Sequence, residues 1–449
     1  MNNNENKKEE KSATESCSIM LEHQNELPRL PIPELKDTLL KFRTQSVSAL
    51  VHDEKEVEDL ESLMKDFEER DGPKLQQLLQ EYTSNNSSFV EEFWSEAYLA
   101  PDTSVVLNLN PFFLFQGSPY QQQTQVQRAS SLVCCTCKFA VMVQEERLKP
   151  DVFKNVPLCM DQFKALFGSC RIPKIDSQDV VEVSSNSQHI VVFYRNQMYC
   201  FPVLTMTKKG DKIAVCVNEE DISSILTDII QDGNKTSQEE SIQNSLGVLT
   251  TLPRKDWAVA KQTLMQISEK NRNALEIIDS ALFILCLDDF IPKNIHEAAS
   301  NMLHGSTKLV ENKETKKLYQ GGTCSNRWYD KLQIIVTKDG NAGINFEHSA
   351  LDGHTALRMA SDVYAESVVQ LAQSIVTTSI QIPSVISAPL ERAQHKIHPK
   401  KLSFDMTPPL QRTIFHAETA LSDQIVSNDT HVLEYTSYGK RFIVSNKIR

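Results

Sequence analysis

The apolar residues between positions 331 and 347 recur with the two-residue period of a β-hairpin. Asp339–Gly340, a dipeptide typical of tight turns, separates the two arms. The alternating apolar positions are Leu332, Ile334 and Val336 on the first arm and Ala342, Ile344 and Phe346 on the second. This pattern predicts two paired strands with one face more buried than the other.

Other segments also carry strand patterns. Residues 189–203 form two arms of β-branched and aromatic residues around Arg195–Asn196, which predicts a second hairpin. Residues 281–289 are a continuous apolar run bounded by charge, which is typical of a strand buried on both faces. Shorter strands are expected at 248–252 and at the start of 104–115.

Helical spacing of apolar residues dominates much of the remaining chain. The prolines of residues 27–35 force an extended entry before a helix that starts near Glu34, and further helices are expected up to Leu99. After Leu158, three apolar residues lie on one helical face, namely Met160, Phe163 and Leu166. Longer helices are expected at 126–146, 257–269, 358–379 and 410–427.

Composition indicates a large globular protein with buried cores. The chain has 449 residues, of which 40% are apolar, and this is too long for one ordinary domain. Its net charge of −12 argues against a nucleic-acid partner or an acidic membrane surface. The cluster Cys134, Cys135 and Cys137 lies in an apolar segment without the paired spacing of a zinc site, so we expect these thiols in the core and no metal ion.

The sequence predicts a cytoplasmic location. Residues 1–26 are polar and are expected to form a disordered tail, with too many acidic residues for a mitochondrial presequence and no apolar signal core. The last residues, 447–449, are not a peroxisomal address. No apolar run is expected to reach the roughly 18 residues of a transmembrane segment.

His348 and Asp352 are the candidate catalytic residues. The second strand of the 331–347 hairpin delivers His348 at its end, and Asp352 follows after three residues. A carboxylate near a histidine holds one ring nitrogen as the N–H tautomer and leaves the other available to take a proton, as a general base requires. The alternative is a histidine with a purely structural role, which is the commoner situation for an isolated His–Asp pair.

Several segments resemble the choline/carnitine acyltransferase family. The most specific are Asn-Arg-Trp-Tyr-Asp-Lys at 326–331 and Glu-His-Ser-Ala-Leu-Asp-Gly at 347–353. Weaker matches are the proline-rich entry at 27–35, the Pro-Leu-Cys-Met and Arg-Ile-Pro segments between 157 and 173, and the Arg254/Trp257 pair. The resemblance extends to about Phe442 and stops before the second half of a complete family member.

The resemblance implies an α/β fold made of a chloramphenicol-acetyltransferase-like mixed sheet covered by helices, with an incomplete second domain of the same type. The expected organisation is a tail at 1–26, a helical lead-in at 27–99, an acyltransferase N-domain at 100–390 and the start of a truncated C-domain at 391–449. Arg171 is expected to pair with a carboxylate in a structural role.

The resemblance also implies a CoA-dependent O-acyltransferase that acts on carnitine. His348 would be its general base and Asp352 the partner that orients it, while acyl-CoA is a co-substrate and no cofactor is bound permanently. Lys440 and Lys447 match lysines associated with CoA, although Val444 stands where a further lysine is expected. The oxyanion donors would lie in sequence beyond Arg449.

Three alternatives stay open on the sequence. The chain is either a carnitine enzyme, a choline enzyme, or a non-catalytic truncated relative that acts as a binding or regulatory remnant. A peptide-condensation domain shares the His-x-x-x-Asp-Gly motif, but Glu347 replaces the first histidine that such domains usually carry. Acyl chain length and oligomeric state do not follow from the sequence.

Overall fold

A seven-stranded mixed sheet forms the centre of the larger of two units. The computed structural model describes residues 18–84, 86–117, 123–209, 212–311, 316, 318–375, 382–393 and 395–447. Asn25–Ala100 form one unit, here called the helical unit. The other, called the sheet unit, comprises Pro101–Arg449 and the residues before Asn25, as far as they are described. The expected tail at 1–26 lies mostly outside the described residues.

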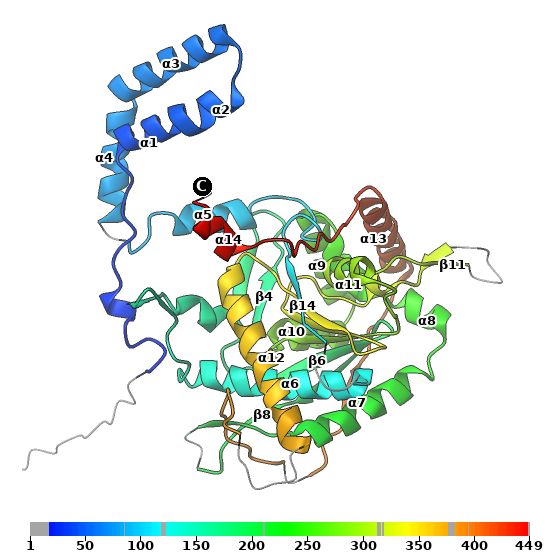
Figure 1. Cartoon of the computed structure of the whole chain (residues 1–449). Coiled ribbons are helices and arrows are strands. Elements are labelled where there is room, and N and C mark those ends of the chain that lie inside the picture. The colour runs from blue at the N-terminus through cyan, green and yellow to red at the C-terminus, as the bar shows by residue number, and fades with distance from the viewer. Residues whose placement is uncertain are drawn as a thin grey trace, which may run out of the picture. The chain divides into compact units, whose positions relative to one another are not determined.

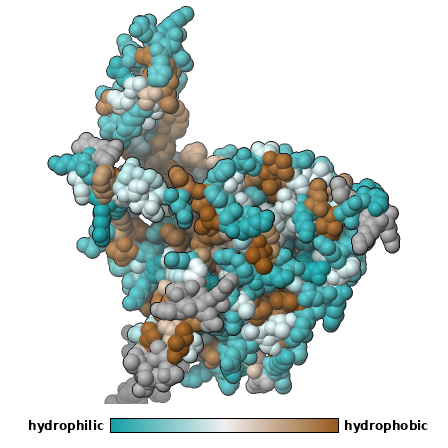
Figure 2. Space-filling model, turned by 45° about the vertical axis from the view of Figure 1, so that its right-hand side comes forward, coloured by the Kyte–Doolittle hydropathy of each residue, from teal (hydrophilic) through white to brown (hydrophobic). Residues whose placement is uncertain are grey.

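The helical unit consists of short and medium helices. Asp53 caps the longest of them by accepting a hydrogen bond from the Glu56 N–H, which satisfies one of the free amides at the helix start. Its elements are α1 (Leu35–Lys41), η2 (Phe42–Val47), α2 (Ser48–Leu50), α3 (Glu54–Glu69), α4 (Gly72–Thr83) and α5 (Glu91–Leu99), with η1 (Gln24–Glu26) at its beginning. Apolar side chains lie on the surface of this unit (Figure 2), among them Leu40, Leu50, Leu63, Leu75 and Leu78.

The central sheet has the strand order β1-β14-β13-β10-β6-β7-β15. β10 is parallel to both of its neighbours, and the other pairs are antiparallel. The strands are β1 (Phe112–Leu114), β6 (His189–Tyr194), β7 (Gln197–Pro202), β10 (Ile284–Asp288), β13 (Gln333–Thr337), β14 (Ala342–Asn345) and β15 (Lys400–Leu402). The mixed α/β fold with a large sheet covered by helices is confirmed.

Four two-stranded ribbons accompany the central sheet. They are β2 (Val152–Phe153) with β3 (Val156–Pro157), β4 (Ser169–Ile172) with β5 (Val180–Val183), β8 (Leu204–Met206) with β9 (Ile213–Val215), and β11 (Leu309–Glu311) with β12 (Leu318–Gln320).

Helices cover both faces of the sheet (Figure 1). On one face, α6, α7 and α12 pack against side chains such as Val192, Leu285 and Ile334. On the other, α9, α10, α11 and α13 pack around the alternate side chains, such as Val191 and Ile335. These helices are α6 (Gln125–Gln144), α7 (Glu219–Gly233), α9 (Arg254–Ile267), α10 (Glu269–Ser280), α11 (Ile295–Leu303), α12 (Gly353–Ile375) and α13 (Pro408–Val426). The short elements α8 (Gln238–Gln243), α14 (Lys440–Ser445), η3 (Asp161–Ala165), η4 (Leu246–Thr251) and η5 (Thr323–Ser325) connect them.

Residues after 390 share the core of the sheet unit. β15 pairs with β7, and Leu402 and Leu410 are buried in the same apolar cluster as Trp257. Thr407 caps α13, whose first turn contains two prolines that need no hydrogen-bond partner there. The domain boundary expected at 390 stays a prediction.

Both predicted hairpins and the buried strand are present. Arg195 and Asn196 take positive φ at the β6–β7 turn, as does Gly340 between β13 and β14. β10 is buried along its whole length. One face of β13 was expected to be more exposed than the other. β13 is instead buried on both faces, because it lies between β10 and β14 and has helices on both sides.

Three local predictions differ from the structure. The strand expected at 248–252 is the 3₁₀ turn η4, in which the hydroxyls of Thr250 and Thr251 donate to backbone carbonyls three residues earlier. The helix expected after Leu158 is only the short turn η3, followed by β4. Residues 104–109 form no strand, and β1 begins at Phe112.

The helix α6 is long and apolar enough to cross a membrane by length and composition, whereas no such segment was expected from the sequence. Within the fold, however, 78% of its apolar stretch is buried. Cys134, Cys135 and Cys137 lie on this helix and are buried, as expected, and burial raises their pKa values. The helix therefore has the environment of a core helix.

Candidate active site

His348 lies in the loop between β14 and α12 and is half-buried. Its ring nitrogen Nδ1 is 2.7 Å from the carbonyl oxygen of Leu351. A carbonyl oxygen accepts hydrogen bonds only, so Nδ1 carries the hydrogen of the neutral ring. The other ring nitrogen, Nε2, then has the lone pair that a general base uses.

Asp352 is exposed and directly precedes α12. Its Oδ1 accepts a hydrogen bond of 2.8 Å from the N–H of Gly353, and its own N–H donates to Oε1 of Gln162 at 2.8 Å. The contact at Nδ1 of the His348 ring is made by the Leu351 carbonyl, with two residues between them, and the orienting role expected of the Asp352 carboxylate stays a prediction. Asp352 thus holds the loop at the start of α12.

The residues on either side of His348 face the protein interior. Glu347 is 6% exposed and Ser349 is 8% exposed. One carboxylate oxygen of Glu347 accepts from Nη1 of Arg171 at 3.1 Å, and the other accepts from both the N–H and the hydroxyl of Ser349. These contacts of Glu347 were not predicted from the sequence, in which the residue served only to exclude condensation domains.

A series of buried ion pairs extends from Glu347 into the core. Arg171 and Arg254 donate through Nε to the same oxygen of Asp179, at 2.7 and 2.5 Å. Arg254 also donates to Asp330 at 2.8 Å, and the second Asp330 oxygen accepts from the indole N–H of Trp257 at 2.7 Å. We call Glu347, Arg171, Asp179, Arg254 and Asp330 the buried ion-pair chain. The structural role predicted for Arg171 is confirmed.

The Asn-Arg-Trp-Tyr-Asp-Lys segment is a structural anchor. Arg327 is fully buried and donates to both oxygens of Asp288, each at 2.7 Å, at the end of β10. The side chain of Asn326 donates to the Leu287 carbonyl at 3.1 Å. The ammonium of Lys331 donates to two backbone carbonyls, and burial lowers its pKa. This segment therefore fixes β13, whose partner strand β14 leads to His348.

Lys440 and Lys447 are both exposed and belong to the α14 region. Among the described residues, the hydrogen bonds and ion pairs give neither side chain a partner. Their predicted contact with CoA stays a prediction. In the part of the chain that the structure describes, no group of three His, Cys, Asp or Glu side chains is placed to hold a metal ion.

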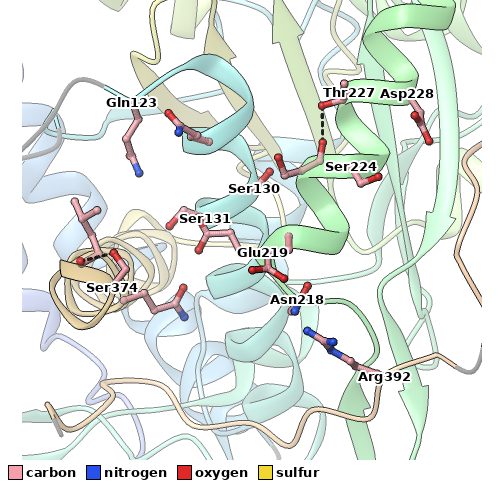
Figure 3. Close-up of a pocket in the computed structure, with 15 residues that line it drawn as sticks. Gln123, Ser130, Ser131, Asn218, Glu219, Ser224, Thr227, Asp228, Ser374 and Arg392 are labelled. Atoms are coloured by element: carbon pink, nitrogen blue, oxygen red, sulfur yellow. Dashed lines mark hydrogen bonds between the residues drawn. The ribbon is translucent and has the colours of Figure 1, made fainter. Parts of the chain in front are cut away.

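A pocket of about 850 Å³ lies apart from His348. Figure 3 shows Ser130 and Ser131 of α6 facing residues of α7, with Ser374 near the end of α12 and Arg392 at the margin. At 1.5 Å per helical residue, α12 places the end that lines the pocket roughly 30 Å from its beginning next to His348. The hydroxyl of Ser374 donates to a carbonyl of its own helix, so it is already paired.

Comparison with known proteins gives one consistent family. Residues 30–449 match the family described as Choline/Carnitine o-acyltransferase. A "Putative mitochondrial carnitine O-acetyltransferase" of Saccharomyces cerevisiae is 34% identical over 93% of this chain and 65% of that protein. "Carnitine O-palmitoyltransferase 2, mitochondrial" of Homo sapiens is 28% identical over 95% of this chain and 64% of that protein.

The chain thus spans slightly less than two thirds of the length of these relatives. Their names place them in mitochondria, so the cytoplasmic location that we expected is wrong. The acidic residues near the N-terminus, on which that expectation rested, are a poor guide to the compartment. The chain belongs to the choline/carnitine O-acyltransferase family.

Proposed function

We propose that this chain carries the general base of an acyltransferase that moves an acyl group between CoA and the hydroxyl of carnitine. The observation that carries the proposal is the 2.7 Å contact between Nδ1 of His348 and the Leu351 carbonyl, which leaves the lone pair on Nε2. The printed names of the relatives favour carnitine over choline. Family membership supports the same reaction class.

In this reaction Nε2 of His348 takes the proton of the substrate hydroxyl. The oxygen attacks the thioester carbonyl carbon, and the carbon–sulfur bond breaks. The CoA thiolate then takes the proton back from the imidazolium, so the histidine returns to its neutral form. A positioned base of this kind contributes about 10²–10⁴-fold to the rate. No covalent acyl-enzyme is formed.

Acyl-CoA is a co-substrate in this proposal, and no resident cofactor takes part. Lys440 and Lys447 are proposed to attract the phosphates of CoA, because both ammonium groups are exposed. Asp352 is proposed to act indirectly, by fixing the loop that carries the Leu351 carbonyl. We also propose that the fold is completed by a second domain of the same sheet-and-helix type.

The test is thiol release from acetyl-CoA by the 449-residue chain, measured with carnitine and separately with choline. We expect release that depends on carnitine and is lost in His348→Ala. His354→Ala is the matched control, because His354 lies six residues further on and pairs with Asp151 at 3.1 Å. Wild-type turnover in His348→Ala would overturn the proposal. A folded wild-type chain without any release would also overturn it and favour a non-catalytic role.

A further inference from the structure

We infer that Glu347 is a positioning residue that fixes the backbone on both sides of His348. This inference rests on the proposed role of His348 as the general base. The Glu347 carboxylate makes contacts in two directions, to Arg171 through one oxygen and to Ser349 through the other. In the sequence, His348 lies between Glu347 and its partner Ser349.

The Ser349 contact constrains the loop at the position of the histidine. The carboxylate of residue 347 accepts from the N–H of residue 349 at 3.0 Å, so it closes a short turn around residue 348. Side chains that bond to the backbone two residues onward stabilise turns in this way. Because Glu347 and Ser349 are buried and His348 is half-buried, the turn presents the imidazole away from the interior.

The Arg171 contact fixes the carboxylate itself. Arg171 lies on β4, and its Nε donates a hydrogen bond to Asp179. The same carboxylate also accepts a hydrogen bond from Arg254 of α9. All five side chains of the buried ion-pair chain are nearly inaccessible to solvent. Moving one charged group away from such partners is strongly unfavourable, so Glu347 has a single preferred orientation. Supporting groups of this kind are what keep a catalytic side chain in place.

The imidazole is therefore fixed at two points. Glu347 fixes the backbone of the turn, and the Leu351 carbonyl fixes the ring through Nδ1. The second contact depends on the first, because the carbonyl lies only three residues from the histidine and the ring reaches it only in one conformation of the turn. A change at Glu347 should consequently alter the tautomer of His348 and not only the stability of the fold.

Glu347→Gln is the informative substitution. The amide has nearly the shape of the carboxylate but only one acceptor oxygen, and its NH₂ group is a donor. It must therefore lose either the Arg171 contact or the Ser349 contact, since both partners are donors. The substitution removes one of the two contacts of the residue 347 side chain without creating a cavity.

Glu366→Gln is the matched control. The Glu366 side chain is also buried, and one of its oxygens accepts from Lys138 at 2.9 Å. Its other oxygen accepts from the backbone N–H groups of Val385 and Ile386. It has the same chemistry as Glu347, but it lies on α12 at roughly 20 Å from the helix start next to His348.

The measurement is ¹⁵N NMR of the full chain labelled at histidine, with the His348 signals assigned from their absence in His348→Ala. We expect the wild-type signals to be those of the Nδ1–H tautomer. In Glu347→Gln they should shift toward the signals of a ring that exchanges between its two neutral tautomers. Glu366→Gln should lower the melting temperature but leave the His348 signals unchanged. Equal losses of stability in both variants with unchanged His348 signals would overturn the inference.

If Glu347→Gln does not fold, Ser349→Ala takes its place, because it removes only the hydroxyl donor to Glu347. A smaller shift of the His348 signals in the same direction is expected, and no shift would overturn the inference. The NMR readout does not depend on turnover. Retained turnover in His348→Ala therefore contradicts the proposed function, whereas unchanged ring signals in Glu347→Gln contradict the positioning role.

Discussion

The carboxyl group of Glu418 on α13 lies 2.6 Å from the hydroxyl oxygen of Ser245, and both side chains are buried. The same hydroxyl lies 2.8 Å from the carbonyl oxygen of Ile242. A hydroxyl has one hydrogen, so it satisfies both contacts only if Glu418 is protonated and donates to it. Burial agrees with this assignment, because it raises the pKa of Glu418 to about 7.

Stability should accordingly fall as pH rises toward neutrality. An ordinary glutamate has a pKa near 4.3, so the folded chain holds this proton more tightly than the unfolded chain does. The contribution is fully present below about pH 4.3 and is lost as pH rises through about 7. Its full size is on the order of 3–4 kcal/mol.

Glu418→Gln tests this pH dependence. The glutamine amide stays neutral at every pH, so the melting temperature of this variant should decline less than that of wild type between pH 5 and pH 8. Glu434→Gln, at an exposed position after α13, should follow the wild-type curve. Parallel curves for wild type and Glu418→Gln would mean that Glu418 does not carry the proton.

Arg254→Met should destabilise the sheet unit by about 3–5 kcal/mol, because Asp179 and Asp330 would each lose a buried cationic partner. Lys338→Met is the surface control. Lys338 pairs with Asp289 at 2.6 Å, but both side chains are about half exposed, so its loss should cost less than about 1 kcal/mol. Chemical unfolding followed by circular dichroism measures both. Similar midpoints for the two variants would contradict the assigned importance of the buried ion-pair chain.

Gly247→Ala should be destabilising by about 2 kcal/mol or more. A Cβ at this position would lie 2.1 Å from the backbone oxygen of Arg327, and neither backbone segment is free to move. Gly353→Ala is the control, since a Cβ there meets nothing within 4 Å and alanine favours the start of α12. Thermal unfolding should therefore separate the two variants clearly. A Gly247→Ala variant as stable as wild type would show that η4 does not approach Arg327 this closely.

Thiol reagents should distinguish Cys159 from the cysteines of α6. Cys159 is exposed, whereas burial raises the pKa of Cys134 to about 11 and removes it from solvent. In a Cys17→Ser background, which removes a cysteine outside the described residues, we expect Cys159→Ser to eliminate the fastest phase of the reaction with an aromatic disulfide. A fast phase that survives this substitution would place another thiol on the surface.

Local patterns in the sequence were sufficient to predict the elements that depend on interactions between neighbouring residues. Asn196 and Gly340 take positive φ in their turns, and asparagine and glycine are residue types that favour such turns without knowledge of the fold. The apolar run of β10 is equally direct, because a strand with helices on both sides has no polar face.

The remaining features depend on contacts between distant segments. Asp179 has no periodicity or motif that marks it, yet it joins Arg171 to Arg254, a residue 75 positions away. The Leu351 carbonyl is a backbone group, so no residue type indicates its contact with the His348 ring. Thr250 and Thr251 have strand propensity, but their hydroxyls stabilise a turn instead.

The two outermost strands of the central sheet, β1 and β15, have three residues each. β15 also carries Lys400 and Lys401, both exposed, along the border of the sheet. Short outer strands that carry lysines are poor templates for pairing with a strand of another molecule. The sheet is thereby protected against growth into intermolecular aggregates, even though the strands between these two borders are rich in aliphatic and aromatic residues.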